Sequence, residues 1–158
     1  SNGGDVNGDN IPDFITSANR ANVGGLLRSG IVYWMFGGSG AFLNPVNLNS
    51  LQGNIGAILN GTTSSSTLGY VVKNAKNFGG DQKDDTLITA PNASPGGLLQ
   101  AGQFVVIFGI IPGLDALNGT NGFSANGLLA GDQLGAGASG LGDLNGDGIP
   151  DIGAGAPQ

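Results

Sequence analysis

The sequence predicts an all-β protein built from tandem repeats of short strands, and three observations lead to this fold class. Markers recur in constant order along the 158 residues, as they do in repeat proteins. No window shows the sustained 3.6-residue apolar period of a helix. Short runs rich in β-branched and aromatic residues alternate with turns rich in Gly, Asn and Pro. One four-stranded unit cannot bury both faces, so we expect neighbouring repeats to cover each other in a radial or stacked array.

The most specific marker of the repeat is an acidic stretch of nine residues. It begins at Asp5, recurs 72 residues later at Asn77, and recurs 66 residues after that at Asp143. A second marker is an apolar run that ends in Phe-Gly, and it keeps the first spacing between Gly30–Gly37 and Gly102–Gly109. Because two independent markers share one spacing, the repeat is not a chance match.

A third marker keeps the spacing of 66 residues and links Leu51–Gly69 to Leu117–Gly135. The markers predict a single all-β repeat region over residues 1–158 that holds about two and a quarter repeats. Its segments run approximately over 1–66, 67–132 and a partial 133–158.

Each repeat is expected to contain four short strands and no helix beyond a single turn. The third expected strand is the most apolar and is rich in β-branched and aromatic residues. In the middle copy the expected strands are Leu68–Lys73, Thr86–Ala90, Gln103–Phe108 and a weaker one near Phe123–Leu129.

The acidic residues of the chain predict calcium sites. All 11 are aspartate, and nine of them lie in the three acidic stretches, whose Gly/Asn-rich turns fold short carboxylates inward. In the first and third stretches, oxygen-bearing side chains occupy positions 1, 3, 5 and 9, and a backbone carbonyl is expected at position 7. Ca²⁺ takes six to eight such hard oxygens. The predicted ligands are Asp5, Asn7, Asp9, Ile11, Asp13, Asp143, Asn145, Asp147, Ile149 and Asp151, the two isoleucines through their carbonyls.

Such loops have two other interpretations. An EF-hand is excluded, because a strand pattern instead of a helix follows the loop and the chain contains no Glu. The loops could also be simple Asn-Gly or Asp-Gly hairpin turns. Three carboxylates within nine residues would repel each other without a cation, however, and this favours metal binding.

The middle acidic stretch is a weaker candidate for calcium. It has Asn77 at position 1, Gly79 at position 3 and Lys83 at position 7, and only Asp81 and Asp85 keep their carboxylates. We expect weak or absent calcium there. Lys83 either replaces the cation from within the loop or is a solvated lysine.

A resemblance to a known family rests on these motifs. The stretch Asp143–Pro157 resembles the FG-GAP repeat of integrin α-subunit propellers and of many bacterial surface proteins. The Phe-Gly pairs at residues 36–37 and 108–109, and the stretch Leu117–Phe123, are similar to the bacterial versions. The resemblance implies β-propeller blades with Ca²⁺ in the loop between the first two strands, in an extracellular or cell-surface protein of a bacterium. The first copy departs from the pattern, with Ser17–Asn19 where Gly-Ala-Pro is expected.

Propellers need 4–8 blades, so we expect the chain to belong to a larger propeller or to be completed by other subunits. Sharing of strands between copies would produce a ring or a filament. The expected function is that of a calcium-binding structural or adhesive repeat protein, which associates with itself or with other surface or matrix proteins. The alternative is a propeller segment of a larger secreted enzyme that acts as a docking platform.

Composition argues against several other functions. A net charge of −6 with only five basic residues does not suit nucleic acid. No apolar run reaches the roughly 18 residues of a membrane span. The chain has no His or Cys for a nucleophilic centre, and its clustered aspartates are assigned to metal loops, so we expect no enzyme activity. Core packing is the preferred role of Tyr33 and Trp34 over sugar binding. Modification at the glycosylation patterns of Asn60, Asn92 and Asn118 is left open.

Overall fold

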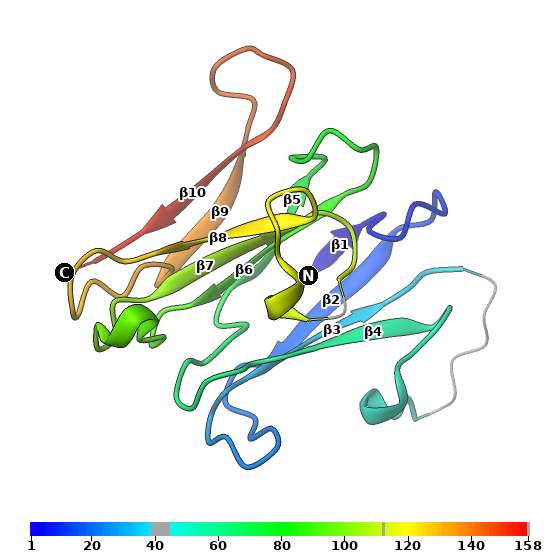
Figure 1. Cartoon of the computed structure of the whole chain (residues 1–158). Helices are drawn as coiled ribbons and strands as arrows, with labels where there is room; N and C mark the ends of the chain where they lie inside the picture. Colours follow the sequence, from blue (N-terminus) through cyan, green and yellow to red (C-terminus); the bar gives the residue numbers. More distant parts are fainter. Residues whose placement is uncertain (39–44, 112, 158) are drawn as a thin grey trace.

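The computed structural model of the protein describes residues 1–38, 45–111 and 113–157, and it consists of antiparallel β-sheets with almost no helix (Figure 1). This confirms the predicted all-β class. The ten strands of the described residues are β1 Asn2–Gly4, β2 Asp13–Ala18, β3 Ile31–Met35, β4 Gly56–Asn60, β5 Val72–Lys76, β6 Asp85–Ala90, β7 Gln103–Ile107, β8 Gly122–Asn126, β9 Gly137–Gly142 and β10 Asp151–Gly155. The helical segments of the described residues are three-residue 3₁₀ turns at Leu48–Ser50, Pro95–Gly97 and Leu114–Ala116. Within the described part of the chain, none is long and apolar enough to cross a membrane.

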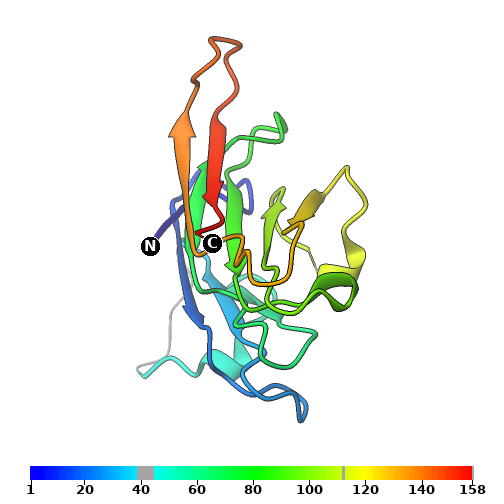
Figure 2. The ribbon, with the colours of Figure 1, turned by 90° about the vertical axis from the view of Figure 1, so that its left-hand side faces the viewer.

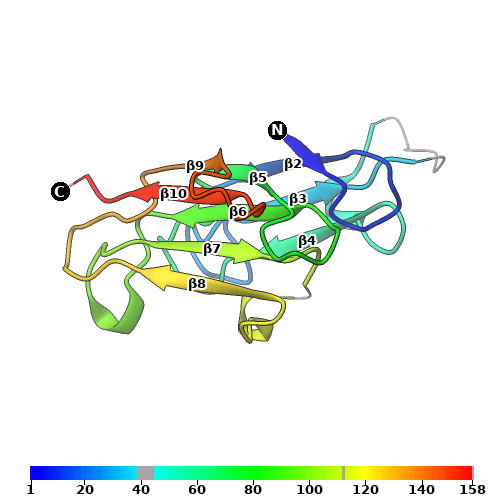
Figure 3. The ribbon, with the colours of Figure 1, turned by 90° about the horizontal axis from the view of Figure 1, so that it is seen from above.

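The strands form two four-stranded sheets, in the order β1-β2-β3-β4 and β5-β6-β7-β8, followed by the hairpin β9–β10. Each sheet is a simple antiparallel meander, because every strand pairs with the next one along the chain. Their first strands lie beside each other, β1 next to β5 and β5 next to β9. Seen from above, the hairpin lies over the second sheet (Figure 3).

The pairing of the first two strands contains the same irregularity in all three sheets. A register shift interrupts β1–β2, β5–β6 and β9–β10 at equivalent residues. The residue at the shift has a positive φ in each case, 74° at Gly4, 57° at Lys76 and 74° at Gly142. A β-bulge of this kind bends the strand and commonly uses glycine for its left-handed residue. The repeat found in the sequence is therefore also a repeat of backbone conformation.

The main core lies between the two four-stranded sheets. Cross-strand pairing places Trp34 between Ile15 and Ala57, and Val32 opposite Leu59, so all these side chains share the face that meets the second sheet. Trp34 is fully buried and its Nε1–H donates a hydrogen bond of 3.0 Å to Thr86 Oγ1 on β6. The preferred assignment of Trp34 to the core is confirmed. From the second sheet the core receives Ile88, Val105 and Ile107.

A second, smaller core lies on the opposite face of the β5–β8 sheet, against the hairpin. Fully buried Leu87 and Val106 are surrounded by a cluster of four phenylalanines. Their ring centroids are 6.0–6.3 Å apart in tilted and edge-to-face arrangements that suit aromatic pairs. The hairpin contributes only Ala138 and Ile152, and all four rings remain partly exposed. The rings belong to Phe78, Phe104, Phe108 and Phe123.

Two strands lie clearly elsewhere than the sequence-based expectation placed them. The strand expected at Leu68–Lys73 runs over Val72–Lys76, because the amides of Gly69 and Tyr70 both donate to the Thr89 carbonyl and draw the chain into a turn before it. The strand expected near Phe123–Leu129 ends at Asn126. After it, the amides of Leu128 and Leu129 both donate to the Asp132 carboxylate and close a loop.

The hydrogen bond across the main core can be tested with two substitutions. Trp34→Phe should lower the free energy of unfolding by about 2–3 kcal/mol, because it leaves a cavity and an unpartnered hydroxyl. Thr86→Val keeps the shape but leaves the buried indole N–H without an acceptor, which should cost about 1–3 kcal/mol. Urea unfolding measures both, with the half-exposed Tyr70→Phe as a control that should change little. If Trp34→Phe were as well tolerated as Tyr70→Phe, the proposed importance of this contact would be wrong.

Candidate metal centre

The three acidic loops connect the first two strands of each sheet, β1–β2, β5–β6 and β9–β10. They therefore occupy equivalent places in the repeat. The first loop is partly covered by its neighbours, whereas the third is exposed from Asp143 to Ile149. Figure 2 shows the third loop projecting beyond the rest of the molecule, at the tip of the β9–β10 hairpin.

The aspartate at position 1 organises the backbone of the first and third loops. Asp5 accepts three hydrogen bonds, from the amides of Gly8, Asp9 and Asn10 at 2.7, 3.0 and 2.8 Å. The equivalent amides donate to Asp143 at 2.7, 3.1 and 2.8 Å. Both loops thus wrap three consecutive N–H groups around one carboxylate, as short Asx-type turns do.

The side chains at positions 3 and 5 are also fixed in the same way in these two loops. Asn7 Oδ1 accepts from the amide of Asp9 at 2.9 Å, and Asn7 Nδ2 donates to Asp9 Oδ2 at 3.1 Å. Asp9 Oδ1 accepts from the amide of Ile11 at 2.8 Å. In the third loop, the corresponding distances among Asn145, Asp147 and Ile149 are 2.9, 3.0 and 2.8 Å.

The aspartate at position 9 has a structural role that the sequence interpretation missed. In the first repeat, the two oxygens of buried Asp13 accept from Val6 in the loop at 2.9 Å and from Gly37, after β3, at 2.8 Å. In the second repeat, buried Asp85 accepts from the amides of Gly79 and Gly109. The carboxylate therefore joins the acidic loop to the turn after the third strand of the sheet, which contains the Phe-Gly pair at residues 36–37 or 108–109 and is the Phe-Gly corner. The sequence does contain a signal for this contact, because the aspartate and the glycine are 24 residues apart in both repeats.

In the third loop, the aspartate at position 9 accepts one of these two hydrogen bonds. Asp151 accepts from the amide of Leu144 at 2.7 Å, which matches the bond from Val6 to Asp13. The hairpin has no third strand in the described residues, so no Phe-Gly corner supplies a second donor.

The middle loop follows the pattern only in part. Asn77 Oδ1 accepts a single bond, from the amide of Gln82 at 3.3 Å, and Asp81 Oδ1 accepts from the amide of Lys83 at 3.0 Å. Lys83 is exposed, and its aliphatic stem passes beside Gly8 of the first loop. The hydrogen bonding of the middle loop therefore differs from that of the first and third loops, and its weak or absent calcium binding stays a prediction.

The first and middle loops are joined directly. The amide of Asp84 donates to the Asp5 carbonyl at 2.8 Å, and Asp84 Oδ2 accepts from the amide of Asp5 at 3.2 Å. Asn74 Nδ2 also donates to Asp84 Oδ2, at 3.1 Å. The third loop has Pro150 at the position of Asp84 and cannot donate such an amide bond.

The donor chemistry of the first and third loops suits a hard divalent cation. Each loop offers carboxylate, amide and carbonyl oxygens and no softer ligand. In the described residues, no three acidic side chains converge closely enough to form a preassembled metal cluster. Asp5 Oδ2 and Asp9 Oδ1 each accept one backbone N–H bond and keep a lone pair for a cation, whereas Asp5 Oδ1 accepts two such bonds.

Burial and hydrogen bonding shift the pKa of individual carboxyl groups in opposite directions. Burial raises the pKa of Asp85 to about 6, opposed by the amides of Gly79 and Gly109, while the charges of Asp81 and Asp84 raise it further. Burial also raises the pKa of Asp13. The pKa of exposed Asp143 is lowered, first by the amide bond from Gly148.

These shifts predict a pH dependence of stability. The folded-state pKa of Asp85, about 6, lies above the ordinary value of 3.8. Its stabilising contribution is therefore complete below about pH 4 and is lost as the pH rises through about 6, a change of about 3 kcal/mol. Urea unfolding in a chelator from pH 4 to 7 measures it. Asp85→Asn cannot ionise, so the difference in free energy of unfolding between wild type and variant should fall over this range; a constant difference would contradict the assignment.

Comparison with known proteins gives no further assignment. No protein-family model matches the chain, and no curated protein is significantly similar to it.

Proposed function

We propose that this protein is a calcium-binding, extracellular structural or adhesive repeat protein of the FG-GAP type. One observation carries the proposal. Two loops that begin 138 residues apart, at Asp5 and Asp143, share the same set of backbone-to-carboxylate hydrogen bonds, although one is partly covered and the other is fully exposed. Since their surroundings differ, the shared conformation comes from the loop sequence itself.

Calcium is the cation that best suits such a loop. The amide bonds to Asp5 and Asp143 hold each loop in a tight turn and spread the negative charge of its first carboxylate over three N–H groups. The side chains at positions 3 and 5 then sit on the same turn, and the carbonyl at position 7 is close in sequence. Ca²⁺ would be held by positions 1, 3, 5, 7 and 9 and would offset the repulsion among the carboxylates.

A propeller arrangement is supported by the way in which the sheets follow one another. Three successive sheets pack face to face, and their first strands lie beside each other as they would around a central axis. Two surfaces of the described residues are incompletely covered. The outer face of the β1–β4 sheet has no neighbouring sheet, and the β9–β10 hairpin covers the phenylalanine cluster only in part.

The outer face of the first sheet supports self-association. Phe14 pairs with Met35 on this face, and both line an apolar cavity of about 350 Å³ together with Phe36 and Val46. The repeat equivalents of Phe14 and Met35 in the second sheet, Thr86 and Ile107, are buried against the first sheet. A further sheet of the same repeat, supplied by a second copy or by a longer chain, would bury this face in the same way.

A second candidate function is a docking platform within a larger secreted enzyme. It uses the same fold and the same calcium sites, and it differs only in what the repeat region is joined to. The partners would then bind at loops, which carry most of the exposed leucines of the described residues.

Calcium binding can be tested by titration and by thermal unfolding. Wild-type protein should bind about two Ca²⁺, and EGTA should lower its Tm by roughly 5 °C or more, since a ligand at 100 times its Kd stabilises by about 2.7 kcal/mol per site. Asp9→Asn combined with Asp147→Asn removes one charge per loop and should abolish most of the binding measured by calorimetry. The matched control is Asp115→Asn, an exposed aspartate outside the loops. A Tm that does not respond to EGTA would refute the calcium assignment.

Self-association can be tested by sedimentation velocity in the presence of Ca²⁺. Wild-type protein should sediment increasingly fast as its concentration rises. Phe14→Asp should reduce this association without unfolding the protein, because Phe14 is 46% exposed. Leu27→Asp, at a residue that is 62% exposed away from this face, should leave association unchanged. A monomer at every concentration would exclude assembly through this face.

A further inference from the structure

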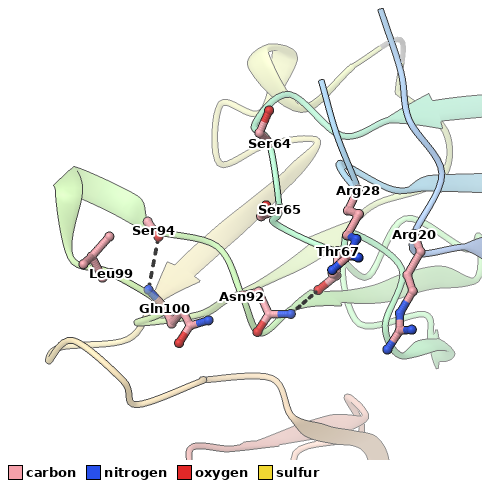
Figure 4. A pocket seen from close by; sticks show the side chains of 9 residues that line it. All are labelled: Arg20, Arg28, Ser64, Ser65, Thr67, Asn92, Ser94, Leu99 and Gln100. Atoms are coloured by element: carbon pink, nitrogen blue, oxygen red, sulfur yellow. Dashed lines mark hydrogen bonds between the residues drawn. The ribbon is translucent and has the colours of Figure 1, made fainter. Parts of the chain in front are cut away.

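A polar cavity of about 510 Å³ lies at the end of the sheets opposite to the acidic loops. It is formed by three connections, between β2 and β3, between β4 and β5, and between β6 and β7. Figure 4 shows Arg20 and Arg28 on one side of it, Gln100 on another, and Asn92 with Thr67 between them. The acidic loops follow the first strand of each sheet, so an antiparallel meander places them at the other end.

The charge of this cavity is opposite to that of the protein. The chain has a net charge of −6 and only two arginines, and both Arg20 and Arg28 line the cavity. No aspartate is among its described lining residues. Within the described part of the chain, neither guanidinium donates a hydrogen bond, so ten N–H donors in total remain for a ligand or water.

The backbone that carries these side chains belongs to the repeat, but the positive charge does not. Arg28 and its repeat equivalent Gln100 both have positive φ, 49° and 51°. Their amides are held in the same way, by Asn22 Oδ1 at 2.8 Å and by Ser94 Oγ at 3.1 Å. The equivalent of Arg20 is Asn92. The second repeat therefore forms the same loop without arginines, and the fold does not require them.

Apart from Leu99, the remaining lining residues carry hydroxyl or amide groups, which can both donate and accept hydrogen bonds. Thr67 Oγ1 accepts from Asn92 Nδ2 at 3.2 Å, which orients the amide inside the cavity. Hydroxyl and amide groups of this kind match ligands that carry many hydroxyls, whereas a bare anion needs donors only. The two guanidiniums would pair with an oxyanion, and arginine is the side chain best suited to grip a carboxylate with two parallel bonds.

We propose that this cavity binds an acidic saccharide, with the carboxylate of a uronate unit held by Arg20 and Arg28 and the sugar hydroxyls held by Asn92 and Gln100. This site is separate from the calcium loops and does not depend on their assignment. A volume of about 510 Å³ lies within the usual range for small-molecule sites.

The binding test uses a trigalacturonate, titrated by calorimetry into the full chain at low ionic strength with Ca²⁺ present. Arg20→Asn combined with Arg28→Gln converts the first loop to the residues of the second repeat, which the same backbone already accommodates. We expect this variant to bind at least about tenfold more weakly. Lys73→Gln combined with Lys76→Gln removes the same charge outside the cavity and should stay within about twofold of wild type.

Three further probes separate the acidic saccharide from other ligands. Maltotriose carries hydroxyls without charge, triaspartate carries carboxylates without hydroxyls, and inorganic sulfate is a simple anion. Trigalacturonate should bind more tightly than each of them. Equal binding of any one of the three, or binding that the arginine variant leaves unchanged, would overturn the proposal. If trigalacturonate instead bound through Ca²⁺ at the acidic loops, the arginine variant would leave its binding unchanged. The variant that combines Asp9→Asn with Asp147→Asn would then lose the binding, which identifies this case.

Discussion

The fold depends on one constraint, which is that each four-stranded sheet carries apolar side chains that must be buried against a neighbouring sheet. In this protein the β1–β4 sheet and the β5–β8 sheet cover each other through an apolar core centred on Trp34, whose indole N–H donates a hydrogen bond to Thr86. The pairing register fixes which side chains share a face. The other side chains of the second sheet therefore lie on its opposite face, which packs against the β9–β10 hairpin. The proposed assembly follows from the two surfaces that this packing of the sheets leaves incompletely covered.

The acidic loops are tied to the same architecture. Buried Asp13 and Asp85 accept amide bonds both from their own loop and from the Phe-Gly corner after the third strand, so loop and sheet edge are fixed together. Burying a carboxylate is costly unless it is hydrogen-bonded, and this explains why a glycine amide is kept within reach. Asp5 and Asp143, in contrast, act within their own loops. The residues first assigned to one cation site thus have two different local roles.

The ends of the molecule also differ in chemistry. Aspartates gather in the loops after the first strands, and the two arginines gather at the opposite end, around the cavity lined by Thr67 and Asn92. The meander connectivity separates them, because successive connections of an antiparallel sheet alternate between its two ends. The proposed calcium loops and the proposed saccharide site therefore lie at separate ends of the same sheets.

The sequence by itself determined the all-β class, the repeat spacing and the loop conformation at Asp5 and Asp143, since these depend on local turn chemistry and on residue periodicity. The prediction from the sequence placed the start of the strand before the middle loop too early. The amides of Gly69 and Tyr70 donate to the distant Thr89 carbonyl instead of extending the pairing of β5 with β6. Only the tertiary structure decided that position-9 aspartates bind a corner 24 residues away, and that Arg20 and Arg28 share one cavity. Such contacts join segments far apart in the chain, and no local pattern encodes which segments the packing of the sheets brings together.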